Sequence, residues 1–277
     1  MTTTHHLKSR AELFHSLHTP GHPLVLPNAW DAASARVIEE AGAAAVATTS
    51  SGVAWALGAA DGNHADGNHA DRDEVLRALA RIVAAVDIPM SADIEGGYAD
   101  DPDGVAETIR GVLAAGAVGV NIEDSQGSAL RDTAEQSARI TAARKAADEA
   151  GVPLFIHART DTYLRNAGGL SETLDRAAAY LAAGASGIFV PGVTDPALVA
   201  ELASAIDAPL GILTGPGAPS VPELAAAGPA RISIGGALAE SAYALVRRGA
   251  RELLERGTYD SFGEAIAYGE FNALMRG

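Results

Sequence analysis

The sequence contains no cysteine, and only two of its 277 residues are lysines, Lys8 and Lys145. The absence of cysteine excludes disulfides, thiolate metal sites and thiol nucleophiles. The scarcity of lysine argues against a Schiff-base aldolase or a pyridoxal phosphate enzyme, because both classes need a reactive amine. Any chemistry in this chain must therefore come from other side chains.

Positive charge is also scarce. The chain has 20 Lys and Arg residues and 35 Asp and Glu residues, which gives a formal net charge of -15. Such a chain lacks the basic surface that nucleic acids and anionic membranes require. The first 24 residues have no apolar core of the signal-peptide type, and no window is long enough to span a membrane. We therefore expect a cytoplasmic protein that acts on small molecules, with neither nucleic acid nor membrane as a partner.

What the sequence does contain is a repeated alternation of short apolar runs and helix-length segments. Three runs follow an Ala-Gly-Ala turn (AGAAAVATTS, AGAVGVNIED, AGASGIFVPG), three open at a proline (IPMSADIE, VPLFIHART, APLGILTG), and HPLVLPN and ARISIGG stand first and last. Runs of this kind are typical of buried parallel strands joined by crossover helices. Eight such units predict an α/β fold, a (β/α)8 TIM barrel, with an open doubly wound sheet as the alternative.

The domain organisation follows from the same pattern. With 48% hydrophobic residues and no long linker, residues 1–277 are expected to form one barrel domain, with an N-terminal extension over about 1–20. The segments Leu238–Arg256 and Ser261–Met275 are predicted to be helices beyond those a barrel needs, within a C-terminal region of about 237–277. They could pack on a neighbouring subunit or cover the barrel of their own chain, and the pattern leaves both open.

The ends of four predicted strands are rich in polar side chains. These ends are Thr48–Gly52, Asp93–Gly97, Asn121–Asp124 and His157–Asp161. In a barrel, catalytic groups come from the C-terminal ends of the strands and the loops that follow. We therefore expect these four segments to converge at one mouth.

Three acids at these ends point to a metal. Asp93, Glu95 and Glu123 carry hard oxygen donors on neighbouring strands, and the alternation along a strand makes Asp93 and Glu95 point the same way. Magnesium takes one or two carboxylates, keeps water ligands and accepts further ligands from the substrate. The acids therefore predict Mg²⁺, with Mn²⁺ as a substitute. Their alternative role is that of solvated loop residues or helix caps.

Arg159, on the adjacent strand, is the candidate for binding a substrate carboxylate in bidentate fashion. Its alternative role is a structural ion pair with Asp161 or Glu123. The backbone amides of the Ser51–Gly52 turn are further candidate anion donors, because glycine allows a ligand to approach the chain closely. Asn121, at the end of the fourth strand, is a candidate substrate contact.

The pentapeptide DGNHA occurs twice in tandem, at Asp61–Ala65 and Asp66–Ala70, in a predicted loop after the second strand. Two histidines five residues apart beside aspartates could suggest a metal site. Loops rich in Gly and Asn hold no fixed ligand geometry by themselves, however, so a solvated loop is favoured over a dedicated metal site.

Several stretches together resemble the isocitrate lyase/phosphoenolpyruvate mutase superfamily. They are PNAWDAASARVIEEAG, TTSSGVAWALGAADG, ADIEGGYADDP, VNIEDS and HARTD, in the order that this family has them. The resemblance covers the chain from about Leu24 to Met275. It implies a barrel with Mg²⁺ at the mouth, an enolpyruvate or its enolate bound to that metal, and a homo-oligomer, a dimer or tetramer, in which a C-terminal helix is exchanged between subunits.

The resemblance also assigns roles to individual residues. Asp93 matches the direct metal ligand, and Glu95 and Glu123 match the acids that hold the metal through water, although the family commonly has aspartate at position 95. Arg159 matches the substrate-binding arginine, and the Ser51–Gly52 turn matches the one that binds the substrate carboxylate.

A catalytic aspartate on the loop after strand two is matched by Asp61, counted from the Leu57–Gly58 pair. Because of the tandem repeat, Asp66 fits almost as well when counted back from Arg72. The resemblance therefore leaves open which copy supplies this aspartate.

Departures from the family pattern bear on the reaction. Isocitrate and methylisocitrate lyases place a catalytic cysteine in the loop after strand four, where this chain has Gln126–Leu130, with neither cysteine nor lysine. The missing cysteine argues against those two activities, and the missing lysine argues against a phosphonomutase. Pro191 also stands where the mutases have a histidine.

The first hypothesis is a Mg²⁺-dependent lyase that acts on a small 2-oxo or 2-hydroxy carboxylate through a metal-stabilised enolpyruvate, by carbon–carbon cleavage or decarboxylation. Its catalytic residues would be Asp61, Glu123 and Arg159, with water, Tyr98 or Asp61 as the proton donor. One alternative is phosphorus–carbon chemistry, with Asp61 as nucleophile and Arg159 or Arg131 in place of the lysine. Another is a non-catalytic barrel that binds a keto acid.

Overall fold

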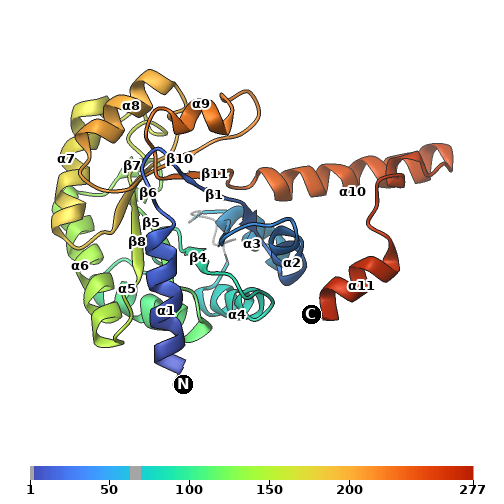
Figure 1. Ribbon diagram of the computed structural model, residues 1–277, viewed down its shortest axis with the longest axis horizontal. Coiled ribbons are helices and arrows are strands. Elements are labelled where there is room, and N and C mark those ends of the chain that lie inside the picture. Colours follow the sequence, from blue (N-terminus) through green and yellow to red (C-terminus); the bar gives the residue numbers. More distant parts are fainter. Residues whose placement is uncertain (1–2, 63–69, 277) are drawn as a thin grey trace.

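The Val-, Ile- and Leu-rich runs form parallel strands in the computed structural model, which describes residues 3–62 and 70–276 (Figure 1). The strands of the main sheet are β1 (Leu24–Leu26), β2 (Asn28–Ala29), β3 (Val46–Thr48), β4 (Met90–Asp93), β5 (Gly119–Glu123), β8 (Phe155–Arg159), β9 (Gly187–Val190), β10 (Leu210–Leu213) and β11 (Arg231–Ser233). Each of the eight predicted runs contributes to this sheet. Burial of Val, Ile and Leu in these strands provides the main stabilisation of the core.

The sheet closes into a barrel through its first run. Its strand order is β1-β11-β10-β9-β8-β5-β4-β3-β2, and all pairs are parallel. Strands β1 and β2 are separated by Pro27 alone, which lacks the N–H that a continuous ladder would need. Because β1 pairs with β11 and β2 pairs with β3, this interrupted run joins the two edges. The predicted TIM barrel is confirmed, and the open sheet is excluded.

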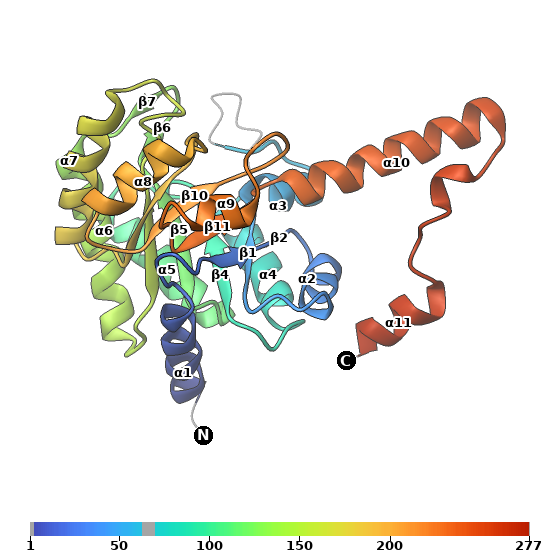
Figure 2. The same cartoon turned by 45° about the horizontal axis from the view of Figure 1, so that its top comes forward.

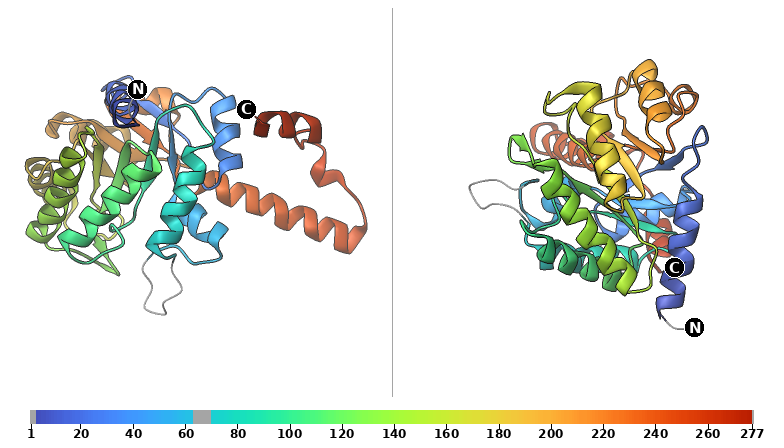
Figure 3. Two further views of the ribbon diagram at one scale, coloured as in Figure 1. Left: turned by 90° about the horizontal axis from the view of Figure 1, so that it is seen from below. Right: turned by 90° about the vertical axis from the view of Figure 1, so that its left-hand side faces the viewer.

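Helices surround the strands on the outside of the barrel (Figures 1 and 3). They are α2 (Ala32–Glu40), α3 (Ser50–Leu57), α4 (Arg72–Val83), α5 (Pro102–Ala115), α6 (Thr133–Glu149), α7 (Gly169–Ala182), α8 (Pro196–Ala205) and α9 (Val221–Ala225). Helix α5 shows how the sequence specifies them: Asp101 caps its N-terminus and Pro102 occupies the first turn. Its residues Val105, Ile109 and Val112 recur at helical spacing and are fully buried.

Helix α1 (Thr3–Ser16) lies under the N-terminal ends of the strands (Figure 2). Phe14 packs edge-on against Phe155 at the start of β8, with ring centroids 5.6 Å apart, and His18 stacks on Phe155 at 4.0 Å. A side chain at Gly119, the first residue of β5, would place its Cβ 2.6 Å from the Phe14 ring. The glycine therefore makes room for the phenylalanine that closes this end of the barrel.

The C-terminal region leaves the barrel. Helix α10 (Ala237–Arg256) projects outward, a 3-10 turn η1 (Asp260–Phe262) follows, and α11 (Tyr268–Arg276) returns towards α2 (Figures 1 and 2). The predicted helix over Leu238–Arg256 is confirmed. The second predicted helix begins later than expected, because the chain reverses around Glu252, whose carboxylate accepts hydrogen bonds from backbone and side chains of 258–261. Within the described residues, no helix is long and apolar enough to cross a membrane.

Candidate active site

A cavity of about 760 Å³ opens at the C-terminal ends of the strands. Its wall comes from the ends of β5 and β8 and from the loops that follow β4, β5 and β8, together with the start of α4. Four of the predicted site residues line it: Asp61, Glu95, Glu123 and Arg159. The polar strand ends therefore converge at one mouth, as their spacing in the sequence predicted.

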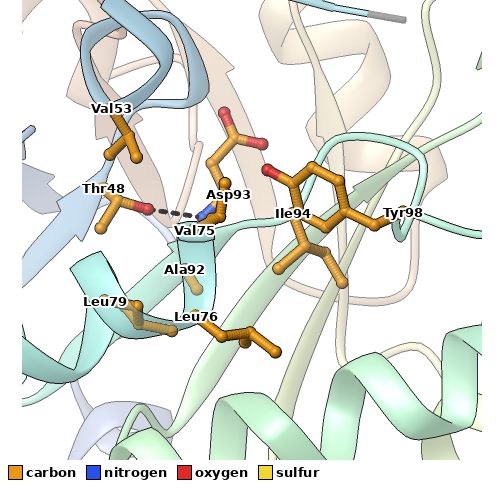
Figure 4. Close-up of a pocket in the computed structure, with 9 residues that line it drawn as sticks. All are labelled: Thr48, Val53, Val75, Leu76, Leu79, Ala92, Asp93, Ile94 and Tyr98. Atoms are coloured by element: carbon orange, nitrogen blue, oxygen red, sulfur yellow. Dashed lines mark hydrogen bonds between the residues drawn. The ribbon is translucent and has the colours of Figure 1, made fainter. Parts of the chain in front are cut away.

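Asp93, the last residue of β4, does not line this cavity; it lines a small separate pocket with Thr48 and Tyr98, and Tyr98 lines both. Its backbone N–H donates to Thr48 Oγ1 at 2.9 Å, and the Ser50 N–H donates to Asp93 Oδ2 at 3.3 Å. Figure 4 shows the Asp93 carboxylate on the same side as the Tyr98 hydroxyl and away from Leu79 below it. The carboxylate is thus held at the border between the apolar layer and the polar cavity.

Glu95 reaches the cavity from a turn. Strand β4 ends at Asp93, and Glu95 follows with a φ of 50°, so its direction is set by the turn and not by strand alternation. The Glu95 N–H donates to Asp93 Oδ1 at 3.2 Å, and the Tyr98 hydroxyl donates to Glu95 Oε1 at 3.1 Å. The two acids lie close together for this local reason.

Buried Arg139, on α6, holds this turn from behind. Its guanidinium donates to the backbone carbonyls of Ala99 at 2.7 Å, Asp100 at 2.6 Å and Gly96. Tyr98, like Glu95, has a positive φ, which costs of the order of 1 kcal/mol or more for a residue with a side chain. The hydrogen bonds from Arg139 offset that cost and fix the turn that carries Glu95.

The crowding of acids changes their protonation. Burial, followed by the charges of Asp93 and Asp61, raises the pKa of Glu95 to about 7, although the Tyr98 hydroxyl opposes the shift. Burial also raises the pKa of Glu123, against the pull of Arg159. Both shifts favour the protonated form of these acids.

Arg159, at the end of β8, is held by two acids. Its Nη1 lies 2.8 Å from Glu123 Oε2, while its Nε and Nη2 lie 2.6 and 3.0 Å from the two oxygens of Asp161. The guanidinium carbon lies 5.9 Å from the centre of the Phe189 ring. Despite its burial, the charges of Glu123 and Asp161 raise the pKa of Arg159, which stays protonated. The ion pairs of Arg159 with Glu123 and Asp161, which were its alternative role, are present. Binding of a substrate carboxylate by Arg159 stays a prediction.

The loop after β5 forms a short hairpin of β6 (Ser125–Gln126) and β7 (Ala129–Leu130). Gln126 and Gly127 line the cavity. Arg131, proposed above as a substitute for the missing lysine, also lines it, but its guanidinium pairs with Asp100 at 2.9 Å and Glu135 at 2.6 Å. Two carboxylates thus already neutralise Arg131.

The predicted residues Ser51, Gly52 and Asn121 do not line the cavity. Ser51 and Gly52 are in the first turn of α3 and not in a loop, and a Cβ at Gly52 would lie 2.7 Å from Trp30 Cβ. Asn121 lies inside the barrel, where its Oδ1 is 3.3 Å from His157 Nδ1. Asp66 and most of the DGNHA repeat lie outside the described residues, so the choice between the two copies stays open.

Sequence reasoning missed Arg165, a cavity-lining residue on the loop after β8, and gave no role to Ser125, the last residue of the VNIEDS stretch. The signal available for Arg165 was a basic residue shortly after the HARTD stretch in a chain with few cations. Arg139 could not be found, because its contacts join segments about 40 residues apart.

The donor set fits a hard divalent cation. Burial, followed by the charges of Asp93 and Asp61, raises the Glu95 pKa, and Arg159, itself paired with two acids, lines the same cavity as Glu95 and Asp61. In the part of the chain that the structure describes, no three Asp, Glu or His side chains form a ready cluster around one point. Magnesium does not need such a cluster, because it keeps water ligands and takes others from the substrate.

Comparison with known proteins identifies the family. Residues 14–254 match the family model described as phosphoenolpyruvate phosphomutase. The 2-methylisocitrate lyase of Escherichia coli is 31% identical over 216 residues, which cover 70% of each protein. The chain belongs to the phosphoenolpyruvate mutase/isocitrate lyase superfamily. The resemblance read from the sequence motifs is confirmed, and the superfamily consists of lyases and mutases.

Two further relatives show how far the similarity extends. An uncharacterized protein of Mycobacterium tuberculosis is 40% identical over 223 residues, which cover 80% of this chain and 81% of that protein. A Burkholderia cenocepacia protein, provisionally assigned as a lyase/mutase, has a crystal structure that superposes with a TM-score of 0.90. It is 38% identical, and the match covers 99% of this chain and 98% of that one, so the fold that the two chains share includes the C-terminal helices.

Proposed function

We propose that this superfamily member is a Mg²⁺-dependent lyase that acts on a small 2-oxo or 2-hydroxy carboxylate through an enolpyruvate intermediate. The bond broken joins the carbon adjacent to the 2-oxo carbon to its carbon substituent, by retro-aldol cleavage or decarboxylation, and the electron pair left on the adjacent carbon forms the enolate. The observation that supports the proposal is a single cavity in which Asp61, Glu95 and Glu123 face Arg159. The hairpin at 125–130 contains neither cysteine nor lysine, so the proposed reaction cannot use the proton donor of the cysteine-dependent lyases.

The acids would hold the metal. Asp93 would bind Mg²⁺ directly, and Glu95 and Glu123 would hold water ligands of the ion. When bound, Mg²⁺ supplies positive charge against the substrate oxygens that gain electron density as the bond breaks. Mn²⁺ offers the same preference for oxygen ligands and is expected to substitute.

Arg159 would bind the carboxylate next to the 2-oxo group. Its contacts with Glu123 and Asp161 hold the guanidinium in one orientation, so little side-chain freedom is lost on binding. The first-turn amides of Ser51 and Gly52 would add hydrogen bonds, since the N-cap residue of α3 makes no side-chain cap.

A proton must reach the carbanionic carbon after cleavage. Tyr98 is one candidate, because burial and the neighbouring acids raise its pKa well above 10 and keep the hydroxyl protonated. Asp61, in the cavity wall, is the other. The variants Tyr98→Phe and Asp61→Asn separate them: the donor's variant should lose about 10²- to 10⁴-fold in turnover, and the other should lose little.

The test is a turnover screen that follows pyruvate and carbon dioxide release from oxaloacetate, 2-methylisocitrate, dimethylmalate and phosphonopyruvate, with Mg²⁺ and with EDTA. Turnover of a carbon substrate that EDTA abolishes supports the proposal. Ligand binding without turnover of any 2-oxo acid favours the non-catalytic barrel instead.

Phosphorus–carbon chemistry is the second candidate, favoured by the match to the phosphoenolpyruvate phosphomutase model. Asp61 would act as nucleophile, with Arg159 replacing the lysine. Phosphonopyruvate turnover followed by phosphorus-31 NMR decides between the candidates, because only this reaction changes the phosphorus signal.

We also propose that the protein is a homo-oligomer, a dimer or tetramer, in the cytoplasm. The support is α10, which extends from the barrel with apolar side chains exposed, among them Val246 at 65% and Leu254 at 84%. Exchange of this helix between subunits would bury them. Light scattering of the intact chain and of a Leu254→Ser variant tests the assembly, and a monomer at all concentrations would contradict it.

A further inference from the structure

The turn that carries Glu95 is held by the helices behind it. Its backbone carbonyls accept hydrogen bonds from side chains of α5 and α6, at Gly96, Gly97, Ala99 and Asp100. Arg139 donates to three of these carbonyls, and the Thr108 hydroxyl donates to that of Gly97 at 2.8 Å. Both side chains are fully buried, and neither lines the cavity. The direction of Glu95 is therefore set from outside the cavity.

The same arginine is joined to the second acid, Glu123. Arg139 Nε donates to Gln136 Oε1 at 3.1 Å, and Gln136 Nε2 donates to the Glu123 carbonyl at 3.1 Å. Because the buried amide group uses both its oxygen and its nitrogen, its orientation is fixed. The Glu123 N–H in turn donates to the Glu95 carbonyl at 2.9 Å. A closed ring of hydrogen bonds thus joins the backbone of the two acids to one helix, α6.

The rigidity of this ring bears on which divalent cation the acids accept. Magnesium requires a near-ideal octahedron with bonds of about 2.0–2.1 Å, whereas calcium accepts irregular geometry and bonds of about 2.3–2.6 Å. Selectivity between the two ions therefore depends on how firmly the oxygen donors are held. Groups that orient a metal site from behind typically change its affinity by about 10- to 100-fold when they are replaced.

We propose that Arg139 is a positioning residue that makes the site select Mg²⁺ over the larger Ca²⁺. The inference rests on the proposed function, because it takes Glu95 and Glu123 to hold water ligands of the ion. Arg139 acts through the turn and through Gln136 and touches neither metal nor substrate. A lysine at this position would keep the positive charge but lose the planar fork that reaches three carbonyls at once. Glu95 would then be free to shift outward and suit the longer bonds of Ca²⁺.

The test measures metal binding without substrate. Electron paramagnetic resonance of Mn²⁺ gives the affinity for this ion, and its displacement by Mg²⁺ or Ca²⁺ gives the two affinities whose ratio is the selectivity. The proteins are the natural chain, Arg139→Lys, Thr108→Val and the control Arg144→Lys. Arg144 lies on the same helix and also donates to carbonyls, those of Leu154 at 2.7 Å and Gly184 at 3.0 Å, but before β8 and β9, at the closed end of the barrel. Thermal unfolding of each protein records its loss of stability.

Arg139→Lys should weaken Mg²⁺ binding about tenfold or more and Ca²⁺ binding much less, so that the ratio of the two affinities falls. Thr108→Val, which removes one hydroxyl from the same turn, should lower the ratio by less. Arg144→Lys should lose stability and keep the ratio of the natural chain.

An unchanged ratio in folded Arg139→Lys, or an equal fall in Arg144→Lys, would overturn the inference. Should Arg139→Lys fail to fold, an unchanged ratio in Thr108→Val overturns it in the same way. If the natural chain binds neither Mn²⁺ nor Mg²⁺, the proposed function itself is wrong, and the inference falls with it.

Discussion

The two ends of the barrel show opposite chemistry on the same strands. Along β8, Phe155, His157 and Arg159 are alternate residues and therefore share one face. Phe155 packs against α1 at the closed end, His157 stacks on Phe189 in the middle, and Arg159 reaches the cavity at the open end. Burial, followed by the charge of Arg231, lowers the pKa of His157 well below its ordinary value, so this imidazole is neutral. Charge increases from the closed end to the mouth within five residues.

The difference separates stability from function. At the closed end, aromatic side chains pack against one another, and these contacts stabilise the folded state. At the mouth, burial and the nearby charges of Asp93 and Asp61 raise the pKa of Glu95, and an ionised Glu95 destabilises the folded state unless a cation is bound. Substitutions at the closed end should therefore change stability alone, and substitutions at the mouth should change activity with little loss of stability.

The largest expected effect is at the mouth. Asp93→Asn should lower turnover by roughly a thousandfold or more, because the charge stabilisation supplied by the metal depends on this carboxylate. The melting temperature without metal should stay the same or rise, since one of the repelling acids is removed. Turnover and thermal unfolding of Asp93→Asn are compared with those of Asp207→Asn, an exposed aspartate in the loop before β10. Full activity in Asp93→Asn would contradict the metal site.

At the closed end we expect the reverse, a loss of stability without a loss of turnover. Phe14→Ala should cost about 3–5 kcal/mol in the free energy of unfolding, because it leaves a cavity beneath β5 and β8. Turnover per folded molecule at low temperature should be unchanged. The control is Leu13→Ala, which removes a half-exposed side chain of the same helix and should cost less than about 1 kcal/mol. A loss of turnover without a loss of stability in Phe14→Ala would show that the two ends are not independent.

The barrel could be predicted from the sequence because its signals are local. Each strand is an apolar run of a few residues, and α5 is specified by Asp101, Pro102 and a periodic apolar face. The late start of α11 could not be predicted in this way. It depends on Glu252, whose carboxylate binds residues that follow the end of its own helix.

The candidate site was predictable in its composition and less so in its geometry. The sequence predicted Asp93, Glu123 and Arg159 as site residues, because the last residues of all strands in a barrel lie at the same mouth. The orientation of Glu95 was not predictable, since it depends on a turn with positive φ held by Arg139 from α6. Contacts of that kind join distant segments and leave no periodic signal.

The smallest expected effect is a dependence of stability on pH that belongs to the mouth alone. The raised pKa of Glu95, about 7, means that the folded state binds this proton more tightly than the unfolded chain, where the value is 4.5. The contribution of Glu95 to the free energy of unfolding without metal should therefore be greatest below pH 4.5. It should fall as the pH rises towards 7. Glu123, whose pKa is also raised, adds to the same trend.

Thermal unfolding with EDTA between pH 5 and 8 should show a decline that Glu95→Gln makes shallower, whereas Phe14→Ala lowers the whole curve and leaves its slope unchanged. Because Mg²⁺ binds the ionised acids, its addition should stabilise the protein more at pH 8 than at pH 5.5. A slope that Glu95→Gln leaves untouched would place the titrating group elsewhere and remove this distinction between the two ends.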